Sequence, residues 1–160
     1  MGKTVNISKK NNDFIGTLNI NREVKKICVN EATGDYIALN PADAGLLDRW
    51  RLFADWFRKE GDRLQKELAK AADGKDESDD VMALIQKRTE YLTNCKKQLD
   101  MVFGEGSAYK IFGDIIPDEM MIAEVMNGMI PFIEQVTQER LNRFTVAQYN
   151  PNRRQRRAKR

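Results

Sequence analysis

The acidic side chains between positions 105 and 119 are the residues whose types and spacing come closest to catalysis or metal binding. Glu105, Asp114, Asp118 and Glu119 lie near one another in the sequence. Paired carboxylates can act as general acid and base, or as ligands of a divalent cation. Their spacing matches no calcium loop, and the chain has no Gly-rich phosphate loop. We therefore interpret these acids as solvated side chains at turns and helix starts.

Histidine is absent from all 160 residues. Its absence removes the usual Ser-His and Cys-His pairs, His-containing zinc sites and the commonest general base. The two cysteines, Cys28 and Cys95, are too isolated for a Cys-x-x-Cys metal site, and each lies in an apolar pattern that predicts a small buried side chain. We expect a protein that is not an enzyme and that holds no metal ion and no cofactor.

Positive charge is concentrated at the end of the chain. The last twelve residues carry six positive charges and no acid, and subtracting +6 from the net charge of +3 leaves −3 for residues 1–148. We expect residues 149–160 to form a basic disordered arm. Three roles stay open for it: contact with an acidic partner protein, weak non-specific binding of nucleic acid, or solubility. The basic residues of the arm are Arg153, Arg154, Arg156, Arg157, Lys159 and Arg160.

The first forty residues predict antiparallel strands. Apolar residues alternate with polar ones twice within residues 5–20, which is the period of a strand. Two further apolar runs, 27–29 and 36–39, flank a polar segment in which Gly34 can adopt a left-handed conformation. The pattern predicts a hairpin within an N-terminal strand region, residues 1–40.

Residues 41–148 change to a helical period and predict a bundle of three long helices. Asn40 is suited to cap the first helix and Pro41 to open it, and apolar spacings of three and four extend this helix to about Ala72. An acidic run at 73–80 separates it from the second helix, which ends before Gly104. The chain as a whole is therefore expected to be an α+β protein.

Glycines punctuate the segment from Phe103 to Asp114, which predicts one short helical stretch between two turns. We interpret this segment as a structural elbow. Pro117 is suited to begin the third long helix. Pro131 lies inside the apolar pattern of that helix and should kink it or split it into two pieces.

Four of the seven methionines, at positions 120, 121, 126 and 129, cluster in the third long helix. Flexible thioethers suit a surface that accepts several helical partners, but most of these positions also fall on the apolar stripe, which indicates core packing. Both interpretations stay open. Met121, Met126 and Met129 are candidate partner contacts. Trp56 lies off the main stripe of its own helix and is a candidate exposed aromatic contact.

The stretch FGEGSAYKIFGD at 103–114, the long helix expected after it and the ending YNPNRRQRR at 149–157 together resemble small tail proteins of siphophages and prophages of Gram-positive bacteria. Such proteins are commonly regarded as tail assembly chaperones or minor tail proteins. The resemblance implies a non-enzymatic assembly factor that binds the tape measure protein or tail tube subunits. It also implies the host bacterial cytoplasm, and the sequence agrees, because it shows neither a secretory signal nor an apolar run of about 20 residues.

Two other functions stay open. A structural minor tail subunit retained in the virion is one, since exposed strand edges at the N-terminal region invite pairing between copies, and a homo-oligomer is compatible with this. A small nucleic-acid-binding regulator that uses the Arg-rich arm is the other.

Overall fold

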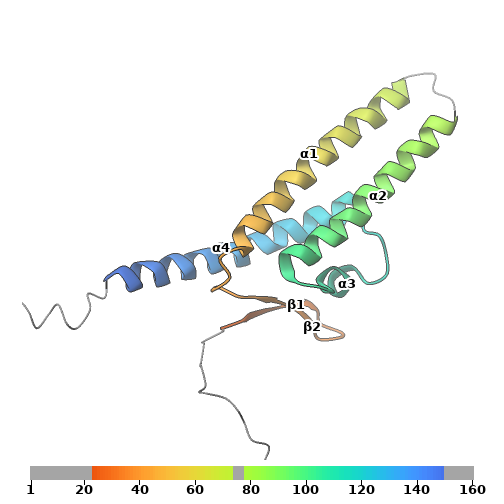
Figure 1. The fold of residues 1–160 in the computed structure, drawn as a ribbon. Helices are drawn as coiled ribbons and strands as arrows, with labels where there is room; N and C mark the ends of the chain where they lie inside the picture. Colours follow the sequence, from red (N-terminus) through yellow and green to blue (C-terminus); the bar gives the residue numbers. More distant parts are fainter. Residues whose placement is uncertain (1–22, 74–77, 150–160) are drawn as a thin grey trace, which may run out of the picture.

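A computed structural model describes residues 23–73 and 78–149 of the chain. Figure 1 shows a two-stranded sheet beneath one end of a helical hairpin, with the last long helix crossing that hairpin. This is the α+β architecture expected from the sequence. The predicted strands within residues 5–20 and residues 150–160 of the predicted arm lie outside the described residues, whereas Tyr149, the first residue of that arm, is the last residue of α4. The elements are β1 (Lys25–Asn30), β2 (Asp35–Leu39), α1 (Leu46–Asp73), α2 (Ser78–Phe103), α3 (Ser107–Phe112) and α4 (Glu119–Tyr149).

Strands β1 and β2 pair antiparallel, with Ile27 opposite Ile37, and they confirm the predicted hairpin. Gly34 has a φ of 72°, and its N–H donates to the Asn30 carbonyl at 2.8 Å, which closes the turn. Ile37 and Leu39 face the core, because alternate residues of a strand point to one side.

The outer face of the same hairpin carries Cys28, opposite Tyr36. Its side chain is exposed, so the prediction of a buried Cys28 is wrong. The reason is the parity of the strand, since Ile27 and Val29 on either side of it are the residues that pack against the core. Cys95 on α2 is fully buried, as predicted.

Helix α1 begins five residues later than the sequence predicts. Asn40 does not cap it: Asn40 Oδ1 accepts the N–H of Ala42 at 2.8 Å and closes a local turn. Asp43 Oδ1 then accepts the N–H of Gly45 at 2.9 Å. Each of these two side chains accepts a hydrogen bond from the backbone N–H two residues further on. The turn therefore has hydrogen bonds of its own, and the helix begins only at Leu46.

Helices α1 and α2 form an antiparallel pair whose inner face is aromatic. Trp50 lies 5.7 Å from Phe103 between ring centroids, and Phe57 lies 5.8 Å from Tyr91. Phe53 between them is 1% exposed. Aromatic rings from both helices therefore fill the interface along the half of the pair that is nearer the sheet. Contacts between such rings stabilise a fold by more than their buried area alone.

The elbow after α2 has the predicted form of one short helix between two turns. Gly104, Gly106 and Gly113 have φ values of 104°, 80° and 66°, a region that favours glycine. Asp100 Oδ1 accepts the N–H of Ala108 at 2.8 Å and fixes α3 to the end of α2. Phe112 of α3 is buried against the core, as expected of a structural elbow.

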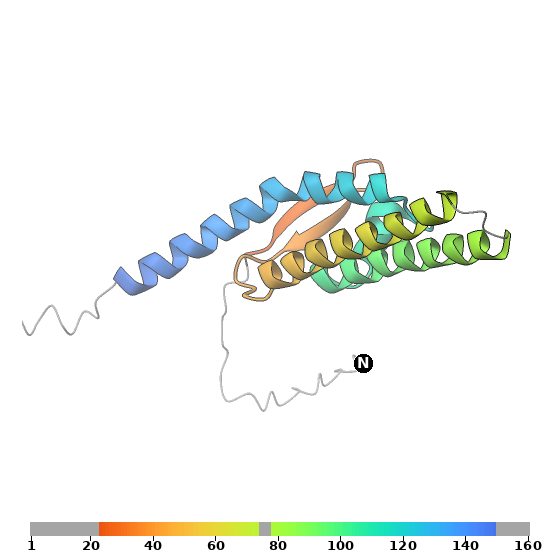
Figure 2. The same cartoon turned by 90° about the horizontal axis from the view of Figure 1, so that it is seen from above.

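Helix α4 begins at Glu119, just after Pro117, and Asp118 Oδ1 accepts the N–H of Met121 at 2.8 Å as its cap. The helix is not split at Pro131. It bends along its length in Figure 2, which is how a helix accommodates an internal proline. None of the helices in the described ranges has the length and apolarity needed to cross a bilayer.

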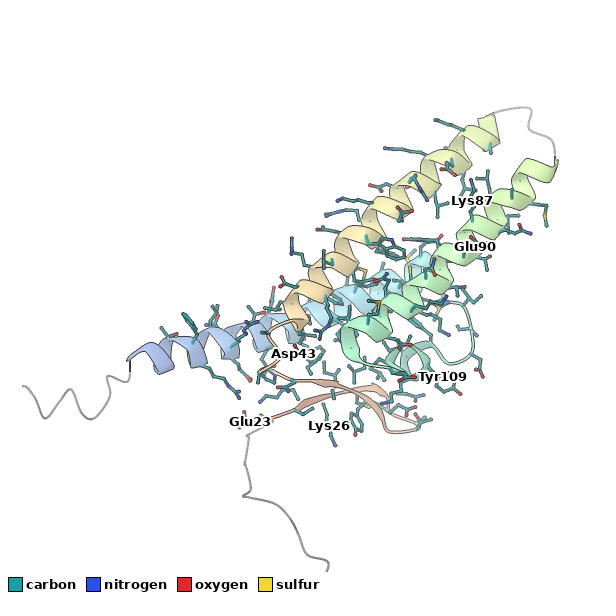
Figure 3. The ribbon with its side chains drawn as sticks, in the orientation of Figure 1. Glu23, Lys26, Asp43, Lys87, Glu90 and Tyr109 are labelled. Carbon is teal, nitrogen blue, oxygen red and sulfur yellow. The ribbon has the colours of Figure 1, made fainter. Side chains whose placement is uncertain are left out.

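The tip of the α1–α2 pair extends past the first turn of α4 in both views (Figures 1 and 2). Val81 and Ile85 on this part of α2 are 43% and 49% exposed. They are exposed because α4 begins too far down to cover them. Lys87 Nζ and the carboxylate of Glu67 lie 3.5 Å apart across the pair near this tip (Figure 3).

Candidate protein-binding groove

An apolar groove of about 520 Å³ lies between α1 and the first turns of α4. Its volume falls in the range of about 300–1,000 Å³ that is usual for ligand pockets. Apolar side chains line its interior, and charged side chains line its rim. The lining residues are Phe57, Arg58, Gly61, Asp62, Leu64, Gln65, Leu68, Tyr91, Glu119 and Ala123.

Two small residues, Gly61 and Ala123, line the hollow. On α1, Phe57, Gly61, Leu64 and Leu68 share one face, because they are spaced four, three and four residues apart. Gly61 has no side chain, and the Tyr91 hydroxyl lies 3.1 Å from where a Cβ atom would stand, so this position makes room for Tyr91. Ala123 contributes only a methyl group from α4 and so leaves space between the two helices.

Tyr91 reaches this site from α2 and is held in place by a hydrogen bond. Its hydroxyl donates to the backbone carbonyl of Phe57 at 2.8 Å. Burial raises the pKa of Tyr91 far above its usual range, and burial also raises the pKa of Cys95 to about 12. Both groups are therefore neutral at physiological pH, and neither is an activated nucleophile.

An ion pair at the rim fixes the start of α4 to α2. The guanidinium of Arg88 donates from Nε to Glu119 Oε1 at 2.7 Å and from Nη2 to the other carboxylate oxygen. The hydrogen bond from Arg88 holds the pKa of Glu119 below its usual range. A bidentate pair also fixes orientation, so it sets the width of the groove at this end.

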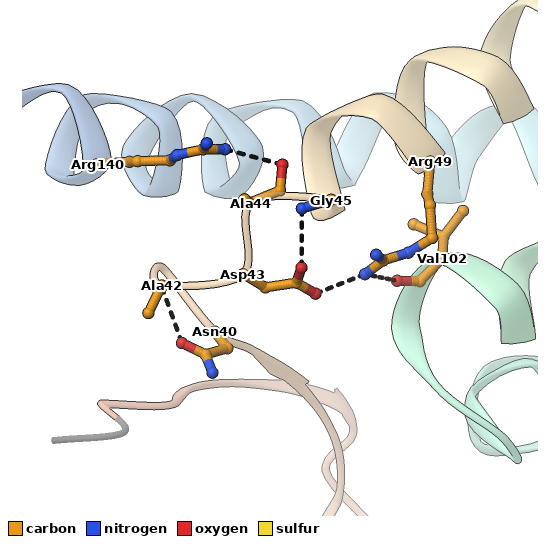
Figure 4. A network of polar contacts seen from close by, with 8 residues as sticks. All are labelled: Asn40, Ala42, Asp43, Ala44, Gly45, Arg49, Val102 and Arg140. Atoms are coloured by element: carbon orange, nitrogen blue, oxygen red, sulfur yellow. Dashed lines mark hydrogen bonds and ion pairs between the residues drawn. The ribbon is translucent and has the colours of Figure 1, made fainter. Parts of the chain in front are cut away.

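A second polar cluster holds the other end of α1 (Figure 4). Arg49 Nη2 lies 2.6 Å from Asp43 Oδ2 and 3.4 Å from the Val102 carbonyl, which joins the turn before α1 to the end of α2. Arg140 of α4 donates to the Ala44 carbonyl at 2.9 Å. The hydrogen bond from Arg49 holds the pKa of Asp43 below its usual range. The turn at 40–45 thus anchors all three long helices.

The acids expected at turns and helix starts lie where the sequence predicts. Glu105 and Asp114 are exposed in the elbow, and Asp118 caps α4. Glu119 is the exception, because it is half-buried and paired with Arg88. Among residues 23–73 and 78–149, no three acidic or thiol side chains come together as a possible metal site.

The candidate methionine contacts do not form one surface. Met129 is 4% exposed and belongs to the core, so its assignment as a partner contact is wrong. Met126 packs half-buried against the core, whereas Met121 is 37% exposed. Positions 121 and 126 are five residues apart, which places them roughly 140° apart around a helix. Neither lines the groove.

Trp56 is not the freely exposed ring expected from its position off the main stripe. It is half-buried and packs against the core, with ring centroids 5.5 Å from Tyr91 and 6.5 Å from Phe53. The aromatic stripe of α1 is wide enough to include it, because α2 and α4 both approach this helix. The six basic residues of the arm, Arg153, Arg154, Arg156, Arg157, Lys159 and Arg160, lie outside the described residues.

The groove itself was not predicted from the sequence. The spacing that predicts this helix puts Leu64 and Leu68 on its apolar stripe, but only Leu64 is buried, whereas Leu68 is 36% exposed. The signal that could have revealed the groove is Gly61, a glycine inside a long helix, where it costs about 1 kcal/mol relative to alanine. Such a residue often marks a close contact or a missing side chain.

Comparison with known proteins gives a family and no function. No curated protein matches the chain, and no solved structure matches it. One family model, described as a family of unknown function, DUF6673, matches residues 34–160. That range holds the second strand, all four helices and the groove, and it covers well over half of the sequence. The chain therefore belongs to the DUF6673 family.

Proposed function

We propose that this chain is a non-enzymatic assembly factor of phage tails, which binds an amphipathic helix of the tape measure protein or a tail tube subunit in the host bacterial cytoplasm. The observation that supports the proposal best is the groove between α1 and α4. The identity of the client comes from the resemblance of segments 103–114 and 149–157 to small siphophage tail proteins.

The groove suits a few side chains of a helix rather than a whole helix. Its length follows the α1 face from Phe57 to Leu68, which is 11 residues or about 16 Å at 1.5 Å per residue. A helix that lies along such a face inserts residues spaced three and four apart. Two or three aliphatic or aromatic side chains of a client would fill the groove beside Ala123. Arg58 and Asp62 at the rim would meet its polar side chains.

The chemistry of the buried groups agrees with binding rather than catalysis. Tyr91 and Cys95 are neutral at physiological pH. The Glu119 carboxylate is occupied by Arg88. These groups hold the helices together at the groove.

The test is binding between the purified 160-residue chain and purified siphophage tape measure and tail tube proteins, by isothermal calorimetry. The variant Leu68→Arg should weaken binding at least tenfold, because it places a charge in an apolar groove. Leu52→Arg is the matched control: the residue is also on α1 and is 59% exposed, but it lies outside the groove. Equal binding by the wild type and Leu68→Arg would show that the groove is not the binding site. If neither tail protein bound, the proposed function would be refuted.

A further inference from the structure

One edge of β1 has no strand partner in the part of the chain that the structure describes, because the sheet there consists of β1 and β2 alone. The Tyr36 carbonyl of β2 accepts a hydrogen bond from Lys110 Nζ at 3.3 Å, which indicates that it points away from β1. Cys28 stands directly opposite Tyr36. In an antiparallel pair, opposite residues point their backbone groups either both toward or both away from each other. The N–H and C=O of Cys28 therefore point to the free edge of β1.

The same direction holds for Lys26, because the backbone groups of a strand alternate from one residue to the next. The turns, caps and loops of residues 23–73 and 78–149 supply no backbone partner for Lys26 or Cys28. An edge strand with unpaired N–H and C=O groups is a template for a further strand.

A hollow of about 220 Å³ adjoins this strand, between the core face of the hairpin and α4. Phe132 of α4 lines it and is 40% exposed. Two ion pairs hold the start of β1 beside α4, one of 3.4 Å from Lys25 to Glu139 and one of 2.8 Å from Arg143 to Glu23. The described chain therefore begins beside α4, where an added strand could cover apolar surface.

Residues 14–20, which lie outside the described residues, have the pattern that such a strand requires. Apolar and polar side chains alternate, which is typical of a strand with one face on a core and one in solvent. The apolar positions are Phe14, Leu18 and Ile20, the polar positions between them are Thr17 and Asn19, and Ile15 is the one apolar residue on the polar side.

We propose that residues 14–20 pair with the free edge of β1 as a third, antiparallel strand. A loop of two residues, 21–22, or of four, 21–24, joins the two strands, and both lengths are common in hairpins. Either loop puts Leu18 and Ile20 on the face that carries Ile27, because both preserve the alternation of the strand. These two side chains then cover the hollow beside Phe132.

The polar side chains of the added strand then lie on the outer face of the hairpin, where Figure 3 shows Lys26. A neighbouring segment of the same chain is favoured over a second copy as the occupant. Closing a loop of two to four residues costs little entropy, whereas association of two copies also loses translational and rotational freedom. With the edge of β1 covered, pairing between the sheets of two copies is blocked at this strand.

The experiment is hydrogen exchange by NMR on the ¹⁵N-labelled 160-residue chain. In the wild type, the N–H groups of Lys26 and Cys28 should exchange at least tenfold more slowly than in Thr17→Pro. Residue 17 points its backbone toward β1 with either loop, and proline has no N–H to donate. Asn11→Pro, outside the segment, is the matched control and should behave as the wild type. Ala38 is an internal reference, because its N–H points away from β1 and should exchange quickly in every variant.

A second pair of variants tests which face of the segment meets the core. Leu18→Asp should remove the protection of Lys26 and Cys28, because it directs a charge into the hollow. Asn19→Asp, the same charge on the adjacent residue, should preserve it. Circular dichroism verifies that the helices of each variant are intact, and the Leu18 and Asn19 pair decides the question if Thr17→Pro does not fold.

Three results would overturn the proposal. One is rapid exchange of Lys26 and Cys28 in the wild type, and another is protection that survives Thr17→Pro or Leu18→Asp. The third is protection that increases with protein concentration, which would assign the edge to a second copy.

Discussion

The hydroxyl of Tyr91 occupies space that a side chain at Gly61 would need: a Cβ atom at position 61 would lie 3.1 Å from Tyr91 Oη. That hydroxyl donates to the Phe57 carbonyl at 2.8 Å, four residues before Gly61 on the same helix. The absence of a side chain at Gly61 therefore allows Tyr91 of α2 to reach the backbone of α1.

Gly61→Ala and Tyr91→Phe should be coupled in their effects on the free energy of unfolding. Alanine gains about 1 kcal/mol of helix propensity, but in the wild type it presses on the hydroxyl. In a Tyr91→Phe background the hydroxyl is gone, so Gly61→Ala should stabilise by about 1 kcal/mol more than it does alone. Urea denaturation of the four proteins of the cycle measures this. Additive effects would show that the two residues do not compete for space.

Acid should weaken the attachment of α4 through Glu119. The folded-state pKa of Glu119 lies below the unfolded value of about 4.3, so the ion pair contributes stability above that pH and loses it as the pH falls through the folded pKa. The contribution should stay below about 1 kcal/mol, since both side chains are more than 40% exposed. Glu119→Gln should remove this part of the pH dependence between about pH 5 and pH 3.

Thermal or urea unfolding at several pH values measures this dependence. Glu105→Gln is the control, because Glu105 is exposed in the elbow. If the stability of the wild type and of Glu119→Gln fell in parallel over this range, the pair with Arg88 would not be the cause.

The two cysteines should differ sharply toward a disulfide reagent such as DTNB at pH 8. Cys28 is exposed on the outer face of β1, whereas Cys95 is 0% exposed and its pKa is raised to about 12 by burial. We expect one thiol to react within the mixing time and the second only on unfolding. Cys28→Ser should abolish the fast reaction. A fast reaction in that variant would mean that the α1–α2 pair opens readily at Cys95.

Truncation of two methionine side chains of α4 should have different effects on stability, because one lies in the core and the other on the surface. Met129→Ala should cost about 2 to 5 kcal/mol, because a buried side chain is replaced by a cavity. Met120→Ala should change stability by less than about 0.5 kcal/mol, since that side chain is 69% exposed. Chemical denaturation of both variants checks the difference. Comparable losses would mean that the Met120 side chain is buried rather than exposed.

Turns were predictable from the sequence because their chemistry is local. Gly34 and Gly104 adopt the positive φ that their positions suggested, and the hairpin and the elbow follow from them. The prediction of where α1 starts was wrong for an equally local reason. Asn40 has two possible backbone partners, and it bonds to Ala42 instead of capping a helix. Propensity alone does not decide between the two.

The exposed and buried faces depended on tertiary structure. Ile85 lies in an apolar pattern, and whether it is covered depends on where α4 begins. The groove lies between α1 and α4, and the periodicity within one helix does not indicate how closely a second helix will pack against it. The sequence therefore predicts the elements but not the space between them.

The hydrogen bond from Arg140 to Ala44 joins residues 96 positions apart, and the ion pair between Arg143 and Glu23 spans 120 positions. By contrast, β1 pairs with β2 and α1 with α2, which are neighbours along the chain and close small loops at a low entropic cost. During synthesis, which proceeds from the N-terminus, the β hairpin leaves the ribosome before α2 and α3, the helices that contact β2. Ile37 and Leu39 of the nascent chain must therefore remain uncovered until those helices have been made.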